Sequence, residues 1–152
     1  MDRTPPTLNQ VNIVSGNLDA SIAFYRRLGI DIPDAQVWRT ASGAHHASAV
    51  EPAAPEAAGL DLDSAAFARV WNRGWAGRTD LAGRVVVGFA VAARGDVDRI
   101  YGEMIGAGHR GLQAPYDAFW GARYAIVEDP DGVAVGLMSP VSAEHRAQPP
   151  AV

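Results

Sequence analysis

Residues 119–140, FWGARYAIVEDPDGVAVGLMSP, have the pattern of two β-strands joined by a tight turn. The turn is predicted at residues 129–132, Asp-Pro-Asp-Gly, because proline fixes φ at the second position and glycine tolerates a positive φ. The flanking runs AIV and VAVGLM are apolar and β-prone. Between Gly132 and Met138 no side chain can hold a metal ion or exchange a proton. The stretch therefore predicts a β-hairpin whose last strand is chemically inert.

The size and composition of the whole chain indicate one compact domain. It has 152 residues, of which 48% are hydrophobic and 20% charged, enough apolar matter to bury a core. No apolar run approaches the roughly 18 residues of a membrane span, and MDRTPPTLNQ lacks the apolar region of a signal peptide. A net charge of -4 argues against a nucleic-acid partner. We expect a cytoplasmic protein, with no membrane partner, that binds small molecules.

Two residue types are absent, and their absence excludes several kinds of chemistry. The chain has no cysteine, which excludes disulfides, thiolate nucleophiles and cysteine zinc sites. It also has no lysine, since all 13 basic residues are arginine. Schiff-base chemistry and a phosphate-binding lysine are therefore excluded as well.

Hydrophobic periodicity predicts the same order of elements twice along the chain. The first half predicts a helix from about Leu18 to Leu28 that ends at Gly29. It also predicts a short helix over 64–71 that Asp63 or Ser64 caps. The second half predicts a helix over 96–107. The expected strands cover 8–14, 31–40, 44–50 and 59–62, then 85–91, 111–116, 122–128 and 133–138.

The two halves form a weak internal repeat. Placing Tyr25 on Tyr101, 76 positions apart, brings Val11 onto Val87. We therefore expect an α+β fold of two βαβββ modules, each a four-stranded sheet with a helix on one face. The expected parts are module one (about 8–71), a linker (72–83), module two (about 84–138) and a flexible polar tail (141–152).

Three segments carry a resemblance to a known family. NIVSGNLDASIAFYRRLGI (12–30), VGFAVAARGDVDRIYGEMIGAG (87–108) and WGARYAIVEDPDG (120–132) resemble the vicinal oxygen chelate superfamily, which includes glyoxalases, extradiol dioxygenases and bleomycin-resistance proteins. The resemblance covers about residues 8–140. It implies curved sheets around a shared cleft, commonly completed by a second chain, so a homodimer is expected.

Enzymes of this family hold a metal ion with ligands on the first and last strand of each module. By the resemblance, these positions fall on Gln10 and Asp61 in module one and on Val86 and Gly136 in module two. Gln10 and Asp61 each offer an oxygen, whereas Val86 and Gly136 offer no donor. Two donors fall short of the three or four protein ligands that a transition ion normally takes. The resemblance therefore implies a member with no metal and no other cofactor.

Polar and aromatic residues suggest how the cleft binds a guest. Gln10 and Asn12 share one strand face, as do Asp61 and Asp63, whereas the adjacent His45 and His46 are expected on opposite faces. Trp71 is expected in the core. Arg123 is expected either to bind a carboxylate or ring of the guest or to pair with Glu128 or Asp131. The candidate ligand-binding residues are Gln10, Asn12, Trp38, His46, Asp61, Trp75, Tyr116, Trp120, Arg123 and Gly136.

Three functions remain open at this point. The first is metal-independent binding of a small, partly aromatic organic molecule, similar to the antibiotic-sequestering proteins of the superfamily. The second is a glyoxalase- or dioxygenase-type enzyme that holds a metal through Gln10, His45 or His46, and Asp61. The third is a metal-free lyase or isomerase in which Asp61 is the catalytic general base. Burial raises carboxyl pKa values, so that role is physically open.

Overall fold

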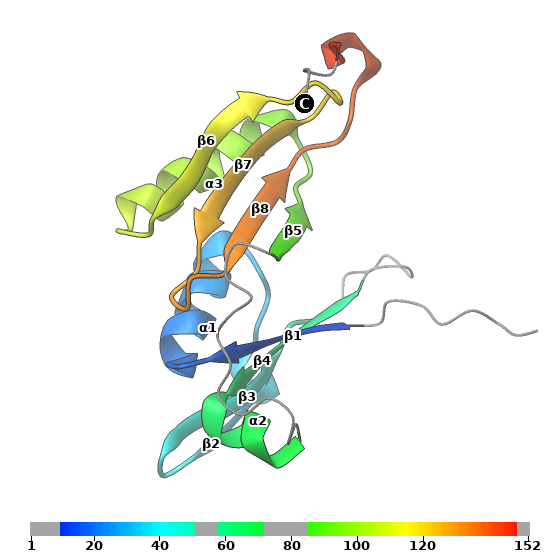
Figure 1. Ribbon diagram of the computed structural model, residues 1–152. Helices are drawn as coiled ribbons and strands as arrows, with labels where there is room; N and C mark the ends of the chain where they lie inside the picture. The colour runs from blue at the N-terminus through cyan, green and yellow to red at the C-terminus, as the bar shows by residue number, and fades with distance from the viewer. Residues whose placement is uncertain (1–9, 51–57, 72–84, 149–152) are drawn as a thin grey trace, which may run out of the picture. The chain divides into compact units, whose positions relative to one another are not determined.

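A computed structural model describes residues 10–50, 58–71 and 85–148 (Figure 1). The chain divides into two compact units, residues 1–78 and 79–152, and each is described by itself. Trp75, the whole of the expected linker (72–83) and the last four residues lie outside the described residues. None of the described helices is long and apolar enough to span a bilayer.

The first unit is a four-stranded mixed sheet with one long helix and one short helix. Its strand order is β1-β4-β3-β2, in which β1 and β4 are parallel and the other neighbours are antiparallel. The elements are β1 (Gln10–Ser15), α1 (Leu18–Leu28), the 3-10 turn η1 (Asp34–Gln36), β2 (Val37–Thr40), β3 (Gly43–Ser48), β4 (Gly59–Ser64) and α2 (Ala65–Trp71).

Helix α1 has the boundaries that the sequence predicts, and both of its ends are capped. The Asn17 side chain accepts a hydrogen bond from the Ala20 amide at 3.1 Å, and Gly29 ends the helix with a φ of 106°. Its apolar stripe is buried, which contributes about 1.5–3 kcal/mol for each large side chain. The buried apolar residues of α1 are Leu18, Ile22, Phe24, Tyr25 and Leu28.

The second unit repeats this topology with the order β5-β8-β7-β6, again with the first and last strands parallel. Helix α3 lies against one face of the sheet (Figure 1). The two units confirm the predicted α+β fold of two βαβββ modules; the shared cleft stays a prediction. The elements are β5 (Val86–Ala90), α3 (Arg94–Gly106), β6 (Gly111–Asp117), β7 (Arg123–Glu128), β8 (Ala134–Met138) and the 3-10 turn η2 (Ala143–His145).

The β7–β8 hairpin is confirmed, and its turn is organised by a buried carboxylate. Asp129 is only 4% exposed. One of its carboxylate oxygens, Oδ1, accepts hydrogen bonds from the backbone amides of Asp131 at 2.8 Å and Val133 at 2.9 Å. Gly132 closes the turn with a φ of 85°. The first aspartate of the motif therefore holds the turn as much as its proline and glycine do.

Two local expectations from the sequence are wrong. Residues 31–36 are not a strand, because the 3-10 turn η1 occupies 34–36. Trp71 is 45% exposed, since α2 has only seven residues and this tryptophan is its last. Part of the tail after residue 141 makes backbone hydrogen bonds to the loop before β7, from the Ser142 amide to the Gly121 carbonyl and from the Ala147 amide to the Phe119 carbonyl, whereas the flexibility expected of it stays a prediction.

Replacing Asp129 by alanine is expected to lower the free energy of unfolding by about 1–2 kcal/mol, because two turn amides lose their acceptor. Chemical denaturation measures the change. Asp129→Asn is the matched control, since it keeps an oxygen in the same place and is expected to retain most of the stability. An equal loss in both variants would mean that the charge, and not the hydrogen-bond geometry, stabilises the turn.

Candidate functional site

Each sheet has one face against its long helix and one face turned away from it, here called the open face. Directly paired residues share a face, and the register places Asn12 beside Asp61, Asp63 beside His46, and His46 beside Trp38. All five residues that the sequence proposed in module one therefore lie on its open face. They are Gln10, Asn12, Trp38, His46 and Asp61.

A buried carboxylate connects the polar residues of this face. The side chain of Asp63 is 2% exposed, yet both of its oxygens are paired. Oδ2 accepts from the Asn12 amide at 2.8 Å, and Oδ1 lies 2.5 Å from His46 Nδ1. The amide of Gln10 donates in turn to Asn12 Oδ1 at 2.7 Å. A buried carboxylate needs such partners to offset its lost hydration.

The second nitrogen of His46 faces a serine hydroxyl. His46 Nε2 lies 3.0 Å from Ser48 Oγ, two residues along the same strand. The imidazole is 31% exposed, so solvent and small molecules reach it while Asp63 stays covered. From the sequence, His46 is predicted as a ligand-binding residue, whereas Asp63 is expected to be either a helix cap or a site residue. Ser64 is the cap, since its Oγ accepts the Phe67 amide at 3.1 Å, and Asp63 belongs to the site.

The expectation that His45 and His46 point to opposite faces is wrong. The pairing of β2 with β3 shifts register between Trp38 and Arg39, which leaves His45 as the extra residue of a β-bulge. Both imidazoles consequently lie near the aromatic rings of the open face. The His45 ring centroid is 5.2 Å from that of Trp38, and the His46 ring centroid is 5.9 Å from that of Phe67.

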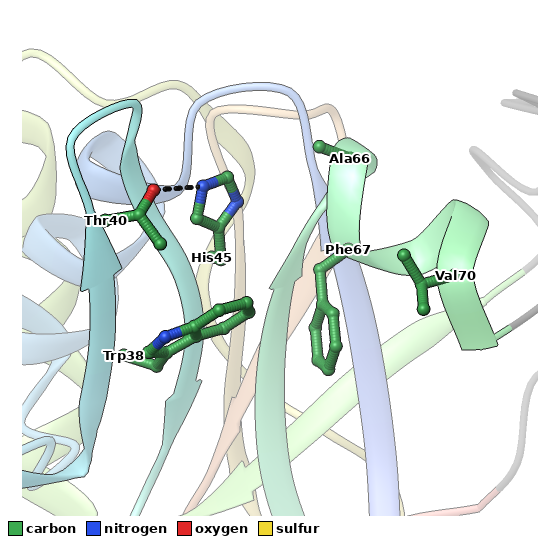
Figure 2. A pocket seen from close by; sticks show the side chains of 6 residues that line it. All are labelled: Trp38, Thr40, His45, Ala66, Phe67 and Val70. Carbon is green, nitrogen blue, oxygen red and sulfur yellow. Dashed lines mark hydrogen bonds between the residues drawn. The ribbon is translucent and has the colours of Figure 1, made fainter.

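An open pocket of about 160 Å³ lies beside this network (Figure 2). Trp38, 49% exposed, faces Phe67 of α2 across it, with ring centroids 5.2 Å apart. His45 lies on its rim and bonds Thr40 Oγ1 at 2.9 Å. The lining residues are Trp38, Thr40, His45, Ala66, Phe67 and Val70. The pocket thus has aromatic walls and few polar groups, a lining typical of sites for organic ligands.

The open face of module two is mostly apolar where that of module one is polar, although Glu128 pairs with Ala134 on it. Gly136 pairs with Gly88 and with Ile126, and Val86 pairs with Ala134. Val86 and Gly136, the metal-ligand positions implied by the resemblance, bring no side-chain donor. Among residues 10–50, 58–71 and 85–148, no three histidine or acidic side chains group closely enough to hold a metal ion. The donors present therefore do not fit the metal site that the resemblance implies.

The space that Gly136 leaves is filled by an aromatic ring. A Cβ built on Gly136 would lie 2.7 Å from the Tyr124 hydroxyl and 3.1 Å from Tyr124 Cε2. The Tyr124 ring also contacts Tyr116 and Trp120, with centroids 6.1 and 5.7 Å away. Burial, and to a smaller extent Tyr116, raises the pKa of the Tyr124 phenol. We call Tyr116, Phe119, Trp120 and Tyr124 the aromatic cluster; it contains the proposed Tyr116 and Trp120.

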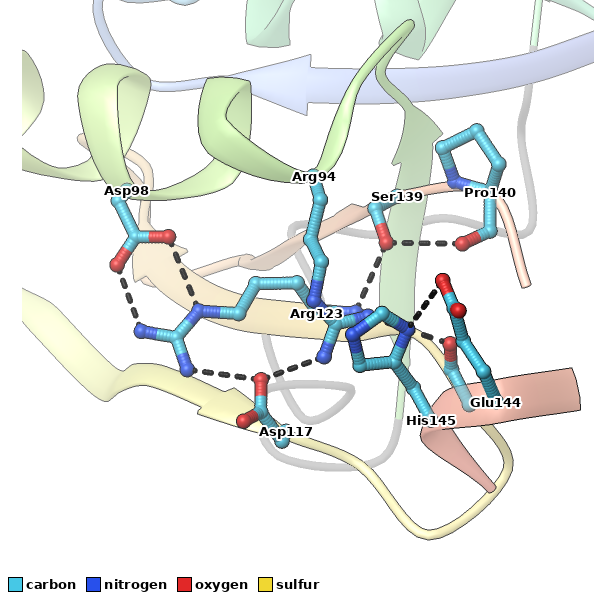
Figure 3. Close-up of polar contacts among 9 residues, drawn as sticks. Arg94, Asp98, Asp117, Arg123, Ser139, Pro140, Glu144 and His145 are labelled. Carbon is cyan, nitrogen blue, oxygen red and sulfur yellow. Dashed lines mark hydrogen bonds and ion pairs between the residues drawn. The ribbon is translucent and has the colours of Figure 1, made fainter. Parts of the chain in front are cut away.

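Arg123 lies on the other side of this sheet, and the sequence-based partners for it, Glu128 and Asp131, are wrong. Its guanidinium binds Asp98 of α3 through two hydrogen bonds of 3.0 and 2.7 Å, and Asp117 of β6 through one of 3.0 Å (Figure 3). The hydrogen bonds to Arg123 hold the pKa of Asp98 below its usual value. Arg94 also binds Asp117, at 2.6 Å. Arg123 therefore joins α3 to the sheet, away from Tyr124.

A protein-family model described as the glyoxalase/bleomycin resistance protein/dioxygenase superfamily matches residues 7–137. Among curated proteins, none matches the chain. Similar solved structures include a glyoxalase/bleomycin resistance protein/dioxygenase family enzyme from Burkholderia phytofirmans PsJN, at 18% identity and a TM-score of 0.70, over 88% of this chain and 98% of that one.

Two further solved structures share the fold at low identity. A glyoxalase-related enzyme from Fulvimarina pelagi is 19% identical with a TM-score of 0.69, over 90% of this chain and 93% of that one. A lactoylglutathione lyase from Agrobacterium tumefaciens is 14% identical with a TM-score of 0.60, over 90% and 96% of the two chains. At these identities the likeness concerns the fold.

Replacing Gly136 by alanine is expected to push the Tyr124 ring outward and to lower the free energy of unfolding by about 1 kcal/mol. The pKa of the Tyr124 phenol should then fall toward its ordinary value of about 10, because the ring regains solvent. Ultraviolet titration of tyrosinate formation measures the pKa, and denaturation measures stability. Gly88→Ala is the matched control, since Gly88 pairs with Gly136 but has nothing within 4 Å of its Cβ position.

The stability of the wild-type protein should also depend on pH through the ionisation of Tyr124. Folding raises the Tyr124 pKa, so the phenol contributes stability below its ordinary pKa and loses that contribution as pH rises through the raised value. Tyr124→Phe should flatten this part of the alkaline stability profile. An unchanged profile in that variant would mean that Tyr124 titrates as an exposed tyrosine.

Proposed function

Because the chain belongs to the glyoxalase/bleomycin resistance protein/dioxygenase superfamily, we propose that it binds a small, flat, partly aromatic organic molecule without a metal ion. The observation that carries the proposal is the exposure of aromatic side chains, both on the open face of module one and in the aromatic cluster of module two. Trp38 is 49% exposed, Phe119 40% and Tyr116 36%. Exposed rings of this kind offer stacking surfaces for a planar guest.

The side-chain chemistry of the expected ligand positions supports metal independence. Val86 and Gly136 provide no donor, and the Tyr124 ring lies against Gly136. On the open face of module one, Asn12 and His46 already bind Asp63. At His46 a transition ion would find only Nε2, which faces Ser48 Oγ at 3.0 Å, and it would gain no donor from Val86 or Gly136.

Planar polycyclic natural products, antibiotics among them, are the proposed ligand class. An aliphatic floor that includes Val86 and Ala134, edged by the aromatic cluster, suits a flat body better than a sugar. Sequestration of such a compound is the proposed role, and a homodimer is the proposed state. Light scattering during size-exclusion chromatography tests the dimer separately from ligand binding.

A metal-dependent enzyme is the second candidate, and one observation favours it. Gln10, His46 and Asp61 share the open face of module one, and Asp61 makes no side-chain hydrogen bond within the described ranges. Asp61 therefore keeps both carboxylate oxygens available to an ion or to a substrate. The similar lactoylglutathione lyase shows that the fold also occurs in an enzyme of the lyase class.

Titration with planar polycyclic compounds is expected to quench the intrinsic fluorescence of the four tryptophans. Trp120→Ala should weaken binding at least tenfold, since an aromatic pair contributes about 0.5–1.5 kcal/mol beyond the buried area. Trp38→Ala tests the pocket of module one in the same way, and Trp71→Phe is the control. If Trp38→Ala and Trp120→Ala both bind these compounds as tightly as the wild-type protein does, neither aromatic surface is the binding site.

Elemental analysis of protein purified without chelator is expected to find no stoichiometric transition metal. A value near one zinc, nickel, iron or manganese per chain or per dimer would favour the second candidate. In that case Asp61→Asn should lower the metal content severalfold, whereas Glu128→Gln, which lies in module two, should not.

A further inference from the structure

We propose that Ser48 is a nucleophile activated by His46, and that Asp63 is the residue that positions His46 for this task. The three side chains form a continuous hydrogen-bonded array on the open face of module one. Ser48 Oγ lies 3.0 Å from His46 Nε2, and His46 Nδ1 lies 2.5 Å from Asp63 Oδ1. Module one thereby carries an acyl-transfer site, an activity beyond the binding of an aromatic guest.

The direction of each hydrogen bond follows from the chemistry of the groups. A carboxylate only accepts hydrogen bonds, so the proton between His46 and Asp63 resides on His46 Nδ1. In the neutral imidazole, Nε2 is then the acceptor, and the Ser48 hydroxyl donates to it. This is the tautomer in which a histidine takes the proton of a serine as the serine attacks.

Asp63 is itself held in place from two sides. Its second oxygen accepts from Asn12 at 2.8 Å, and Asn12 is bound by Gln10 at 2.7 Å. With its side chain 2% exposed, the carboxylate is shielded from water, which strengthens its attraction to the imidazolium formed during proton transfer. His46 is 31% exposed, so its reactive edge remains accessible.

The neighbouring histidine provides an internal comparison. His45 Nε2 lies 2.8 Å from Ser42 Oγ, a contact much like that between His46 and Ser48. Its Nδ1, however, faces the Ser64 hydroxyl at 2.9 Å, where His46 has a carboxylate. A hydroxyl neither fixes one tautomer nor stabilises an imidazolium as a carboxylate does. Ser48 should therefore be activated and Ser42 should not.

The substrate class indicated by the surroundings is an ester with an aromatic or apolar group. The Phe67 ring lies 5.9 Å from the His46 ring, and Trp38 pairs with His46 across the strands. Ser48 Oγ attacks the carbonyl carbon while its proton passes to His46 Nε2. His46 returns the proton to the departing alcohol, which leaves an acyl group on Ser48. Water then attacks this ester as its proton passes to His46, and His46 gives that proton to Ser48 Oγ as the carboxylic acid leaves.

An aryl fluorophosphonate is the probe of choice, because it reports nucleophilic attack without requiring the natural substrate. Ser48 Oγ should form a bond to phosphorus as fluoride leaves, and the hydroxyl proton passes through His46 to water. Intact-mass spectrometry should find one phosphonyl group per chain, and peptide mapping should place it on Ser48.

The variants separate activation from general reactivity. Ser48→Ala and His46→Gln should each slow labelling at least a hundredfold, and Asp63→Asn roughly tenfold or more. Ser42→Ala is the matched control and should label like wild type. Hydrolysis of 4-nitrophenyl acetate should follow the same order. Asn12→Ala, which removes only a partner of Asp63, covers the case in which Asp63→Asn fails to fold, and should slow labelling severalfold.

Labelling that persists in Ser48→Ala, or wild-type protein that stays unmodified in excess probe, would overturn the proposal. Labelling on Ser42 at an equal rate would also overturn it, because the carboxylate would then have no effect. The assay involves no aromatic natural product and no affinity measurement. Its outcome is therefore independent of the proposed binding function.

Discussion

The burial of one carboxylate sets the arrangement of the open face of module one. Asp63 can be buried in the sheet only because donors reach both of its oxygens, one from Asn12 on β1 and one from His46 on β3. These bonds join three strands and fix the imidazole orientation, and the imidazole in turn fixes Ser48. A packing requirement and a chemical capability therefore have the same physical origin: the donor that stabilises the buried charge is the side chain that the charge prepares for proton transfer.

Module two has the same topology, but its open face is mostly apolar where that of module one is polar. At the point of β8 where the family resemblance expects a ligand, the missing Cβ of Gly136 admits the Tyr124 ring. Tyr124 contacts Tyr116 and Trp120, so one glycine permits a cluster of aromatic rings. The inert strand that the sequence displays between Gly132 and Met138 is thus a smooth surface on which aromatic side chains pack.

Short-range sequence patterns made most of the fold predictable. Most of the features that the sequence did not predict depend on contacts between residues far apart in the chain. The turn at 129–132, helix α1 and the repeat follow from spacing and caps within a few residues. Strand alternation also placed Gln10 with Asn12, and Asp61 with Asp63, on a common strand face, and the pairing of β1 with β4 agrees. The partners of Arg123 lie on α3 and β6, where no local pattern points to them. Asp63 and Ser64 both suit a helix cap, and only the neighbouring strands decide between them.

The β-bulge at His45 adds a side chain to the open face of this sheet. Without His45, residues Ala44, His46, Ala47 and Ser48 would still place both alanines toward α1 and both polar side chains outward. His45 is thus an added residue that leaves the phase of the strand intact. A sheet that accepts one extra residue in this way gains a side chain on its open face, while every buried side chain keeps its neighbours. An inserted residue normally disrupts a β-strand because it moves the following side chains to the opposite face. The additional His45 instead leaves the packing of the hydrophobic core unchanged.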